Sequence, residues 1–298
     1  MKKIIYLLFL LISSSAVYAR TVDTGVSYTG ASHFDQVQAD ATLALTLNTL
    51  AGLQVKMAND RVKIADERTF KDPVFSVAVP VALDFDLLRL SIRPFYYFEN
   101  KSDQATYQNA SAYGINTQLR MTLQHNEVED TYSYAFVSAS FARQKGTIFY
   151  DGGTEENRYY SQAAYSLGIS HIFYNAFGLD VIGTAFQYPN GISNVAGLRS
   201  VLDQQELANT QTLDIVHNLT KYTVGARLTR MWTDNGSTLY AGYRYGEYYT
   251  AEPEHSVMVG NSFYIANRVS VDIAYNHVRT VHNKNRRDIW SIQLGASF

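Results

Sequence analysis

After its first twenty residues, the chain alternates apolar and polar side chains with a period of two over most of its length. Clear examples are the segments 37–47, 75–83, 113–123, 222–229 and 269–276. Neighbouring side chains point to opposite faces in a β-strand, whereas an amphipathic helix repeats every 3.6 residues. The pattern therefore predicts a protein built from many two-faced strands, and it argues against a helical fold.

The connections between these strands are alternately short and long. Short turns fall at 84–86, 175–178, 234–237 and 266–268, and long polar segments fall at 60–72, 99–110, 145–157, 187–220 and 282–287. This alternation is typical of outer-membrane barrels, which have short turns at one end and long loops at the other. We therefore predict an all-β fold, a transmembrane antiparallel up-and-down β-barrel of about 14 strands, with 12 to 16 left open. An even number places both chain ends in the periplasm. The predicted strands are 21–30, 36–47, 53–58, 73–83, 87–98, 111–124, 131–144, 158–172, 179–186, 221–232, 238–249, 256–264, 269–280 and 288–298.

Composition excludes several other classes of protein. Of the 298 residues, 17% are charged, below the roughly 25% usual for soluble domains. The net charge of −2 shows no basic excess, which argues against nucleic acid as a partner. The absence of cysteine excludes disulfides, thiol catalysis and cysteine-bound metals. No Pro/Gly/Ser-rich linker divides the chain, so a single domain follows the N-terminal segment.

The N-terminal segment resembles none of the strands. Lys2 and Lys3 precede an apolar run at 4–12, which is too short to span a membrane. Val17 and Ala19 then occupy the small-residue positions of a cleavage site. We predict that residues 1–19 are a cleaved secretory signal peptide and that 20–298 form the barrel. The protein is thus expected to be exported in a Gram-negative bacterium.

Aromatic residues are placed as the two edges of a membrane would require. The groups 95–98, 149–150, 159–160 and 248–249 fall at the predicted outer rim, and 173–174, Phe177, Trp232, 263–264 and Phe298 fall at the inner rim. Rings with one apolar and one polar side favour the headgroup layer. The alternative is a large soluble β-sandwich or lipocalin-like barrel, but a sandwich would need protected edge strands.

The last strand, 288–298, ends the chain on Phe298. It resembles the C-terminal sorting strand of Gram-negative outer-membrane β-barrel proteins. The resemblance implies that the barrel-assembly machinery recognises Phe298. The stretch 240–298 is also faintly similar to the barrel of surface lipoprotein assembly modifiers, although their usual helical-repeat domain is missing here. The size also suits an autotransporter-type translocator, but no passenger precedes the barrel.

If the apolar faces contact lipid, the charged residues between them face the lumen. The predicted pore-lining residues are Lys56, Arg89, Arg93, Arg120, Arg227, Arg244, Asp40, Asp180 and Asp272. Six cations against three carboxylates would favour anions in a water-filled pore. The alternative is that these charges form ion pairs that fill a closed barrel.

Three loop segments offer weaker candidates. In 187–220, Val195, Leu198 and Leu202 have helical spacing and could form a constricting helix, or the segment is an ordinary extracellular loop. The basic segment 282–287 could meet lipopolysaccharide phosphates, or it is a solvated hairpin tip. The acidic residues Asp151, Glu155 and Glu156 match no calcium-loop spacing, so no metal is expected.

Catalytic motifs are missing from the sequence. None of the seven histidines begins a His-x-Ser triplet of the outer-membrane phospholipase type, and adjacent Ser170 and His171 would face opposite sides of a strand. We therefore predict a protein that is not an enzyme and has no cofactor: a passive, porin-like channel for small polar solutes or ions. The alternatives are a translocation or assembly barrel with a protein partner and, less favoured, a lipid-modifying enzyme. Other expected partners are outer-membrane lipid, lipopolysaccharide and the assembly machinery.

Overall fold

In the computed structural model, the described residues are 21–298 except for 32–33, 64–68, 101–106, 127–130, 150–152, 175, 190–218, 233–235, 250, 266–267 and 283–285. Within those residues, no helix has the length and apolarity needed to cross a membrane. The strands are β1 (Val22–Ala31), β2 (Phe34–Thr46), β3 (Thr49–Lys63), β4 (Thr69–Ala78), β5 (Val81–Phe85), β6 (Leu88–Asn100), β7 (Tyr107–Asn126), β8 (Thr131–Phe149), β9 (Glu155–Phe173), β10 (Phe177–Gln187), β11 (Thr220–Trp232), β12 (Ser237–Tyr248), β13 (Glu254–Ile265), β14 (Val269–Thr280) and β15 (Arg286–Ser297).

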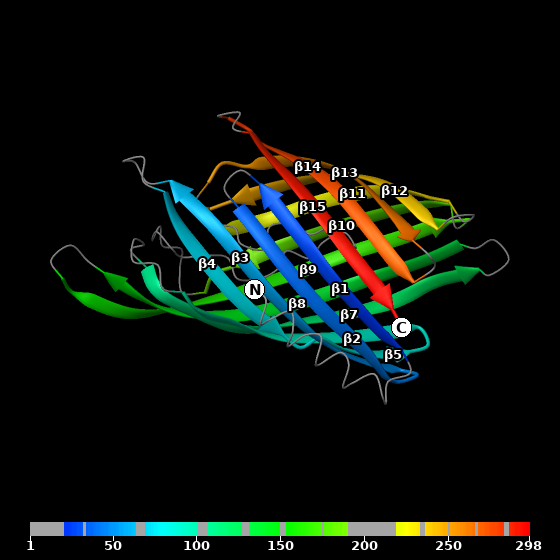
Figure 1. Ribbon diagram of the computed structural model, residues 1–298, viewed down its shortest axis with the longest axis horizontal. Helices are drawn as coiled ribbons and strands as arrows, with labels where there is room; N and C mark the ends of the chain where they lie inside the picture. Colours follow the sequence, from blue (N-terminus) through cyan, green and yellow to red (C-terminus); the bar gives the residue numbers. More distant parts are fainter. Residues whose placement is uncertain are drawn as a thin grey trace.

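The strands form one antiparallel sheet that closes into a barrel (Figure 1). The closing pair is β1 with β15, in a register that places Asp23 opposite Ser297 and Ala31 opposite Ile289. Two backbone hydrogen bonds between Val22 and Phe298 continue this seam to its end. A closed ring leaves no unpaired strand edge, which is the condition for a sheet to be stable in hydrocarbon.

The strand predicted over 73–83 is interrupted at Val79 and Pro80, which separate β4 from β5. Proline lacks an N–H group and cannot donate to the ladder. The Pro80 carbonyl still accepts from the Gly52 N–H at 2.8 Å, and β3 and β6 each pair with both pieces. β4 and β5 therefore count as one strand of the barrel. This confirms the predicted all-β barrel of fourteen strands.

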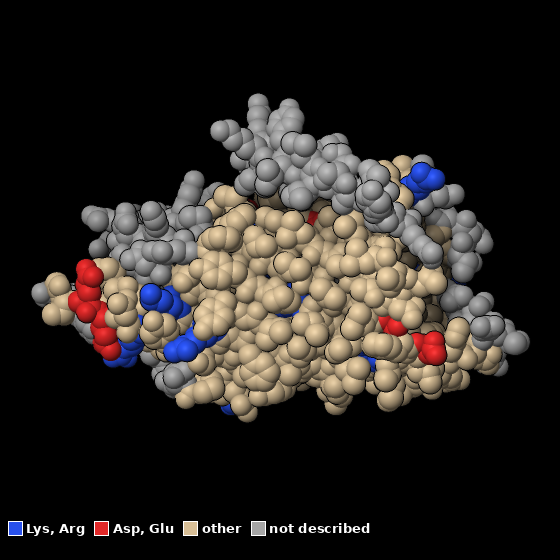
Figure 2. All heavy atoms as spheres, turned by 90° about the horizontal axis from the view of Figure 1, so that it is seen from below, with Lys and Arg blue, Asp and Glu red and all other residues tan. Residues whose placement is uncertain are grey.

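The outward face of the barrel is apolar. On β10, Leu179 and Val181 are exposed, whereas Asp180 and Ile182 are buried on the inner face. Exposed apolar side chains continue around the ring with Leu167, Ile169, Val224, Leu228, Val257, Val259, Ile273, Ile292 and Leu294. Figure 2 shows one side of the molecule, where charged side chains gather toward the two ends and the middle is almost free of them. A surface of this kind is stable against lipid and would aggregate in water.

The two ends of the barrel differ in their connections. Strands are joined at one end, the short-turn end, through 47–48, 86–87 and 233–236, and at the other, the long-loop end, through 101–106 and 190–218. In barrels of this type the short turns are periplasmic. Phe298 lies at the short-turn end with its ring 67% exposed. Its role in assembly stays a prediction, as does the signal peptide, which lies outside the described residues.

Exposed aromatic rings border the apolar surface at both ends. They are Phe173, Tyr174, Phe177, Trp232 and Tyr264 toward the short turns, and Tyr96, Phe98, Tyr159 and Tyr249 toward the long loops. The prediction for 95–98 is half wrong, because only Tyr96 and Phe98 point outward. Phe95 and Tyr97 are 9% and 7% exposed and point into the barrel. Alternate residues of a strand face opposite sides, so a run of four rings is divided between them.

Several inward rings lie over glycines, and one such contact gives a test of the fold. A Cβ atom at Gly114 would lie 2.3 Å from the Phe95 ring and 2.4 Å from the Phe141 carbonyl oxygen. We expect Gly114→Ala to lower the free energy of unfolding by about 1–3 kcal/mol, because the backbone oxygen has no room to move. Gly183→Ala is the control, since its nearest neighbour would be 3.9 Å away. Urea unfolding in lipid vesicles measures both, and equal losses would contradict the packing.

Candidate functional site

The inner wall of the barrel is the candidate site, and it carries all nine charged residues that the sequence singled out. Alternation along each strand places their side chains on the face opposite to the exposed apolar residues. Lys56, Asp180 and Arg227 are the most buried, with exposed fractions of 5%, 9% and 9%. That they line a conducting pore stays a prediction.

Three of the nine residues form a cluster in the short-turn half, which we call the lower polar cluster. The Arg227 guanidinium donates to the Asp180 carboxylate from Nε at 3.0 Å and from Nη2 at 2.8 Å. It also lies 5.6 Å from the centre of the Tyr240 ring, and the Tyr240 hydroxyl donates to Asp272 at 2.7 Å. The cluster thus crosses β10, β11, β12 and β14, and Tyr240 joins the two carboxylates through the arginine.

Tyr240 is a member of this cluster that the sequence pattern missed. Its ring lies directly over Gly260, where a Cβ atom would be only 2.2 Å from the ring. A tyrosine among alternating residues gives no sign of which face it occupies, since it is as common at a membrane rim as in a lumen. The small residue opposite it, Gly260 in the register of β12 with β13, is the one available signal.

The other predicted residues lie mainly on the opposite side of the ring. Arg93 donates to the Gln54 side chain at 3.1 Å, and Arg89 lies 3.6 Å from Asp84 near the turn between β5 and β6. The Arg120 guanidinium is 5.1 Å from the centre of the Tyr134 ring. Asp40 on β2 lies against Gly25 of β1, where a Cβ atom would be 3.0 Å from its carboxylate. Lys56 lies on β3, between Gln38 and Ser76 in register.

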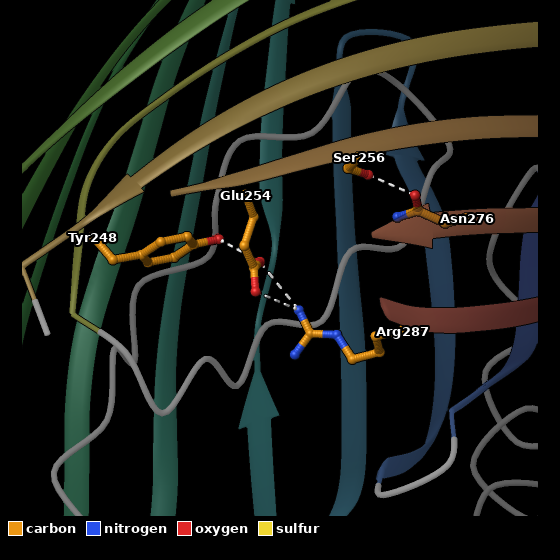
Figure 3. A network of polar contacts seen from close by, with 5 residues as sticks. All are labelled: Tyr248, Glu254, Ser256, Asn276 and Arg287. Carbon is orange, nitrogen blue, oxygen red and sulfur yellow. Dashed lines mark hydrogen bonds and ion pairs between the residues drawn. The ribbon is translucent and has the colours of Figure 1, made fainter. Parts of the chain in front are cut away.

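A second inward group, the upper polar cluster, lies toward the long loops (Figure 3). Glu254 accepts a hydrogen bond from the Tyr248 hydroxyl at 3.1 Å and pairs with Arg287 at 3.2 Å. Beside them, the Ser256 hydroxyl donates to the Asn276 side chain at 2.5 Å. The Glu254 side chain is 12% exposed, so its charge is held mainly by these partners. The alternation pattern alone gives no sign of this cluster.

The two clusters share one sector of the ring. The lower cluster lies on β10–β14 and the upper cluster on β12–β15, and inward-facing Arg244 of β12 lies between them in chain order. Arg244 is opposite Gly225 and Ser256 in register. Together they form what we call the polar track: Asp180, Arg227, Tyr240, Arg244, Tyr248, Glu254, Ser256, Asp272, Asn276 and Arg287.

An apolar layer covers much of the remaining inner wall toward the long loops. Its buried members are Ala58, Val74, Ala78, Phe95, Tyr97, Ala112, Ala142, Ala164, Phe186, Val278 and Ile289. Phe95, Tyr97 and Phe186 are its largest side chains, and the first two meet edge to face with ring centres 5.6 Å apart. β11, β12 and β13, which carry much of the polar track, contribute no side chain to this layer among the described residues. At this level the wall is therefore least apolar along β11–β13, and buried Gln36, Gln144 and Gln162 lie among the apolar side chains elsewhere.

His171 and its neighbours are the arrangement in the described part of the chain that most resembles a catalytic group. His171 Nδ1 is hydrogen-bonded to the Ser133 hydroxyl across β8 and β9. The centres of the His171 and Phe173 rings are 3.9 Å apart. Within the described ranges, no carboxylate is hydrogen-bonded to His171, and no group of three or more His, Asp or Glu is arranged to hold a metal ion. The constriction predicted in 187–220 falls at residues 190–218, outside the described residues, as does Asp151.

The closed antiparallel barrel, apolar outside and polar inside, is the architecture of outer-membrane β-barrel proteins. No family model and no curated protein matches the sequence. Solved structures that resemble it include the toluene transporter TodX of Pseudomonas putida, with 10% identity over 94% of this chain and 88% of that chain at a TM-score of 0.49. OprB of the same organism has 8% identity over 93% of both chains at 0.48. The NanC porin has 11% identity over 92% of this chain and 98% of that chain at 0.43. Sequence identities and TM-scores this low do not indicate a function for this chain.

Proposed function

We propose that the protein is a passive channel through which small polar solutes or ions cross the outer membrane. The observation that carries this proposal is the polar track, which provides hydrogen-bonding groups in both halves of the lumen on one side of the wall. Side chains that exchange hydrogen bonds with a passing solute replace its lost hydration. In this proposal the polar track is the path, and the apolar layer narrows the lumen toward the long loops.

The charges of the inner wall favour anions in the lumen as a whole, whereas the polar track itself carries three arginines and three carboxylates. The nine predicted residues together with Asp84, Glu254 and Arg287 make seven cationic and five carboxylate side chains. Among the described residues, the pairs Arg89–Asp84, Arg227–Asp180 and Arg287–Glu254 each join a cation to a carboxylate. Six of the seven cations are arginines, which keep their charge at every working pH.

Ion selectivity in a planar bilayer tests this proposal. We expect Arg244→Gln to lower the preference for chloride over potassium by about two- to threefold, because a unit charge about 7 Å from an ion in water contributes ~0.6 kcal/mol. Arg244→Lys should retain the preference. Arg143→Gln is the matched control, since Arg143 is outward-facing and its guanidinium lies 4.6 Å from the Tyr159 ring centre.

If the folded barrel carries no current in a planar bilayer, the channel proposal is wrong. The folded state of the purified barrel is checked separately, by its heat-dependent mobility in a gel. A folded but silent wild-type barrel would favour the alternative, a translocation or assembly barrel that opens only with a protein partner. Steady conductance with unchanged selectivity in Arg244→Gln would keep the channel and remove the polar track as its path.

A further inference from the structure

A group of basic side chains lies on the outer face of the barrel, toward its long-loop end. We call His255, His277, Arg279 and Arg286 the outer basic cluster; they lie on β13, β14 and β15. By alternation they share the face of exposed Val257, Ile273 and Ile292. In the register of the sheet, Arg279 is directly opposite Arg286 on one side and His255 on the other.

This arrangement is unfavourable for the barrel alone. Like charges directly opposite on neighbouring strands destabilise a sheet. Among the residues that the structure describes, Arg279 and Arg286 are exposed and neither lies within ion-pair distance of a carboxylate, although Asp288 on the same face attracts Arg286. The nearby Asp288 carboxylate accepts hydrogen bonds from His277 Nδ1 and from the Tyr275 hydroxyl, each at 2.7 Å. Two arginines directly opposite each other on one face are suited to an anion with several oxygens.

The height of the cluster along the barrel wall indicates which layer of the membrane it faces. Arg279 lies ten residues along β14 from Val269 at the short-turn end. With a strand rise of about 3.3 Å per residue and a tilt of about 40°, this is roughly 25 Å, the full height of the apolar band in such barrels. The two arginines therefore lie in the headgroup layer on the long-loop side of the membrane.

A depression in the surface adjoins the cluster at the seam between β15 and β1. It has a volume of about 450 Å³ and is lined by Tyr28, Gly30, Ala31, Arg286, Arg287, Asp288 and Trp290. Gly30 contributes no side chain, and Tyr28 lies over it, since a Cβ atom there would be 2.8 Å from the tyrosine hydroxyl. The depression thus places aromatic surface beside the Arg286 guanidinium, which suits a molecule with a phosphate group and an attached sugar or acyl chain.

We propose that the outer basic cluster binds the phosphate groups of lipopolysaccharide in the outer leaflet. Arg279 and Arg286 contact the phosphate oxygens, and the depression at the seam holds the adjoining part of the lipid. Binding a polyanion there relieves the repulsion between the two arginines. The site lies on the outer surface and is independent of conduction through the lumen.

Binding of fluorescent lipopolysaccharide to the purified barrel in detergent tests this site. We expect Arg279→Gln/Arg286→Gln to weaken the apparent affinity about tenfold, because two charge-assisted contacts are lost. The Arg279→Lys/Arg286→Lys variant should retain most of the affinity. Arg230→Gln is the matched control: Arg230 is also outward-facing, but it stacks 4.2 Å from Phe177 at the short-turn end. It should bind as the wild type does.

Further probes identify the source of the phosphate. Dephosphorylated lipopolysaccharide should bind the wild type about tenfold more weakly, whereas inorganic phosphate and phosphatidylglycerol should compete poorly. Equal affinity of the wild type and the glutamine variant overturns the proposal, as does equal binding of phosphatidylglycerol. Self-association of lipid-free barrel that the variant abolishes would also overturn it, by showing an interface between copies. If the double variant does not fold, each single glutamine variant should show about a threefold loss.

Discussion

Removing two rings from the apolar layer, with Phe95→Ala and Phe186→Ala together, is expected to raise single-channel conductance several-fold. Both side chains are buried in the inner wall, at 9% and 3% exposure. An apolar constriction opposes conduction in two ways, because it is narrow and because it excludes water. Removing the two rings widens the lumen and exposes polar backbone, so both barriers become smaller. The measurement is single-channel current in a planar bilayer at fixed voltage and salt.

The same strand supplies the control for this experiment. Phe98 and Tyr96 lie on β6 beside Phe95 and Tyr97, but point outward and are 44% and 43% exposed. Phe98→Ala should leave the conductance unchanged. Unchanged conductance in the Phe95→Ala/Phe186→Ala variant, with normal gel mobility, would show that the apolar layer is not the barrier. Phe→Ala in a packed site can cost about 3–5 kcal/mol, so the milder Phe95→Leu/Phe186→Leu pair is measured alongside.

Loss of the buried carboxylate in the lower polar cluster should cause the largest change in stability. In Asp180→Ala, the Arg227 guanidinium would remain buried without its ion-pair partner. Breaking one side of a buried pair costs about 3–5 kcal/mol, because the remaining charge is poorly solvated. We expect the free energy of unfolding in urea, measured in lipid vesicles, to fall by about 3 kcal/mol. We expect the lower end of the 3–5 kcal/mol range, because water in the lumen can reach part of the Arg227 guanidinium.

The more exposed ion pair between Arg89 and Asp84 is the control for the stability loss expected in Asp180→Ala. Arg89 and Asp84 are 3.6 Å apart, with side chains 32% and 39% exposed. Exposed pairs contribute about 0–1 kcal/mol, so Asp84→Ala should change the stability by no more than that. Similar small losses in both variants would contradict the burial of the Asp180–Arg227 pair and indicate that water surrounds it fully.

The sequence was sufficient for the barrel because the fold rests on a repeated local pattern. Each strand independently sorts its side chains between lipid and interior, so alternation specifies both the strand and its faces. The inward placement of Asp180 and Arg227 follows from the same rule. The interruption at Pro80 was missed, although proline in a strand is a local signal. The reason is that Val77, Val79 and Val81 continue the alternation across it.

The contacts within the lumen required the structure. Alternation tells that Phe95 and Tyr97 share a face, but four consecutive rings at 95–98 fit a membrane rim equally well. The partners of Glu254 depend on which residues of β12 and β15 reach the same height, which is set by register across β13 and β14. Register between strands is a non-local property. The polar track and the apolar layer are therefore invisible in any single strand.

The seam between β1 and β15 has a consequence for how the chain reaches its final state. Every other strand can pair with a neighbour in sequence, but this pair joins residues such as Asp23 and Ser297 from the two ends of the barrel domain. Closure therefore has to wait until the last strand has been translated and exported, and two free edges must be shielded until then. Truncation within β15 would remove the partner of both β1 and β14. Such a truncation would leave an open ring with two unpaired strand edges, which is prone to aggregation. It would therefore destabilise the barrel by more than the contacts of one strand.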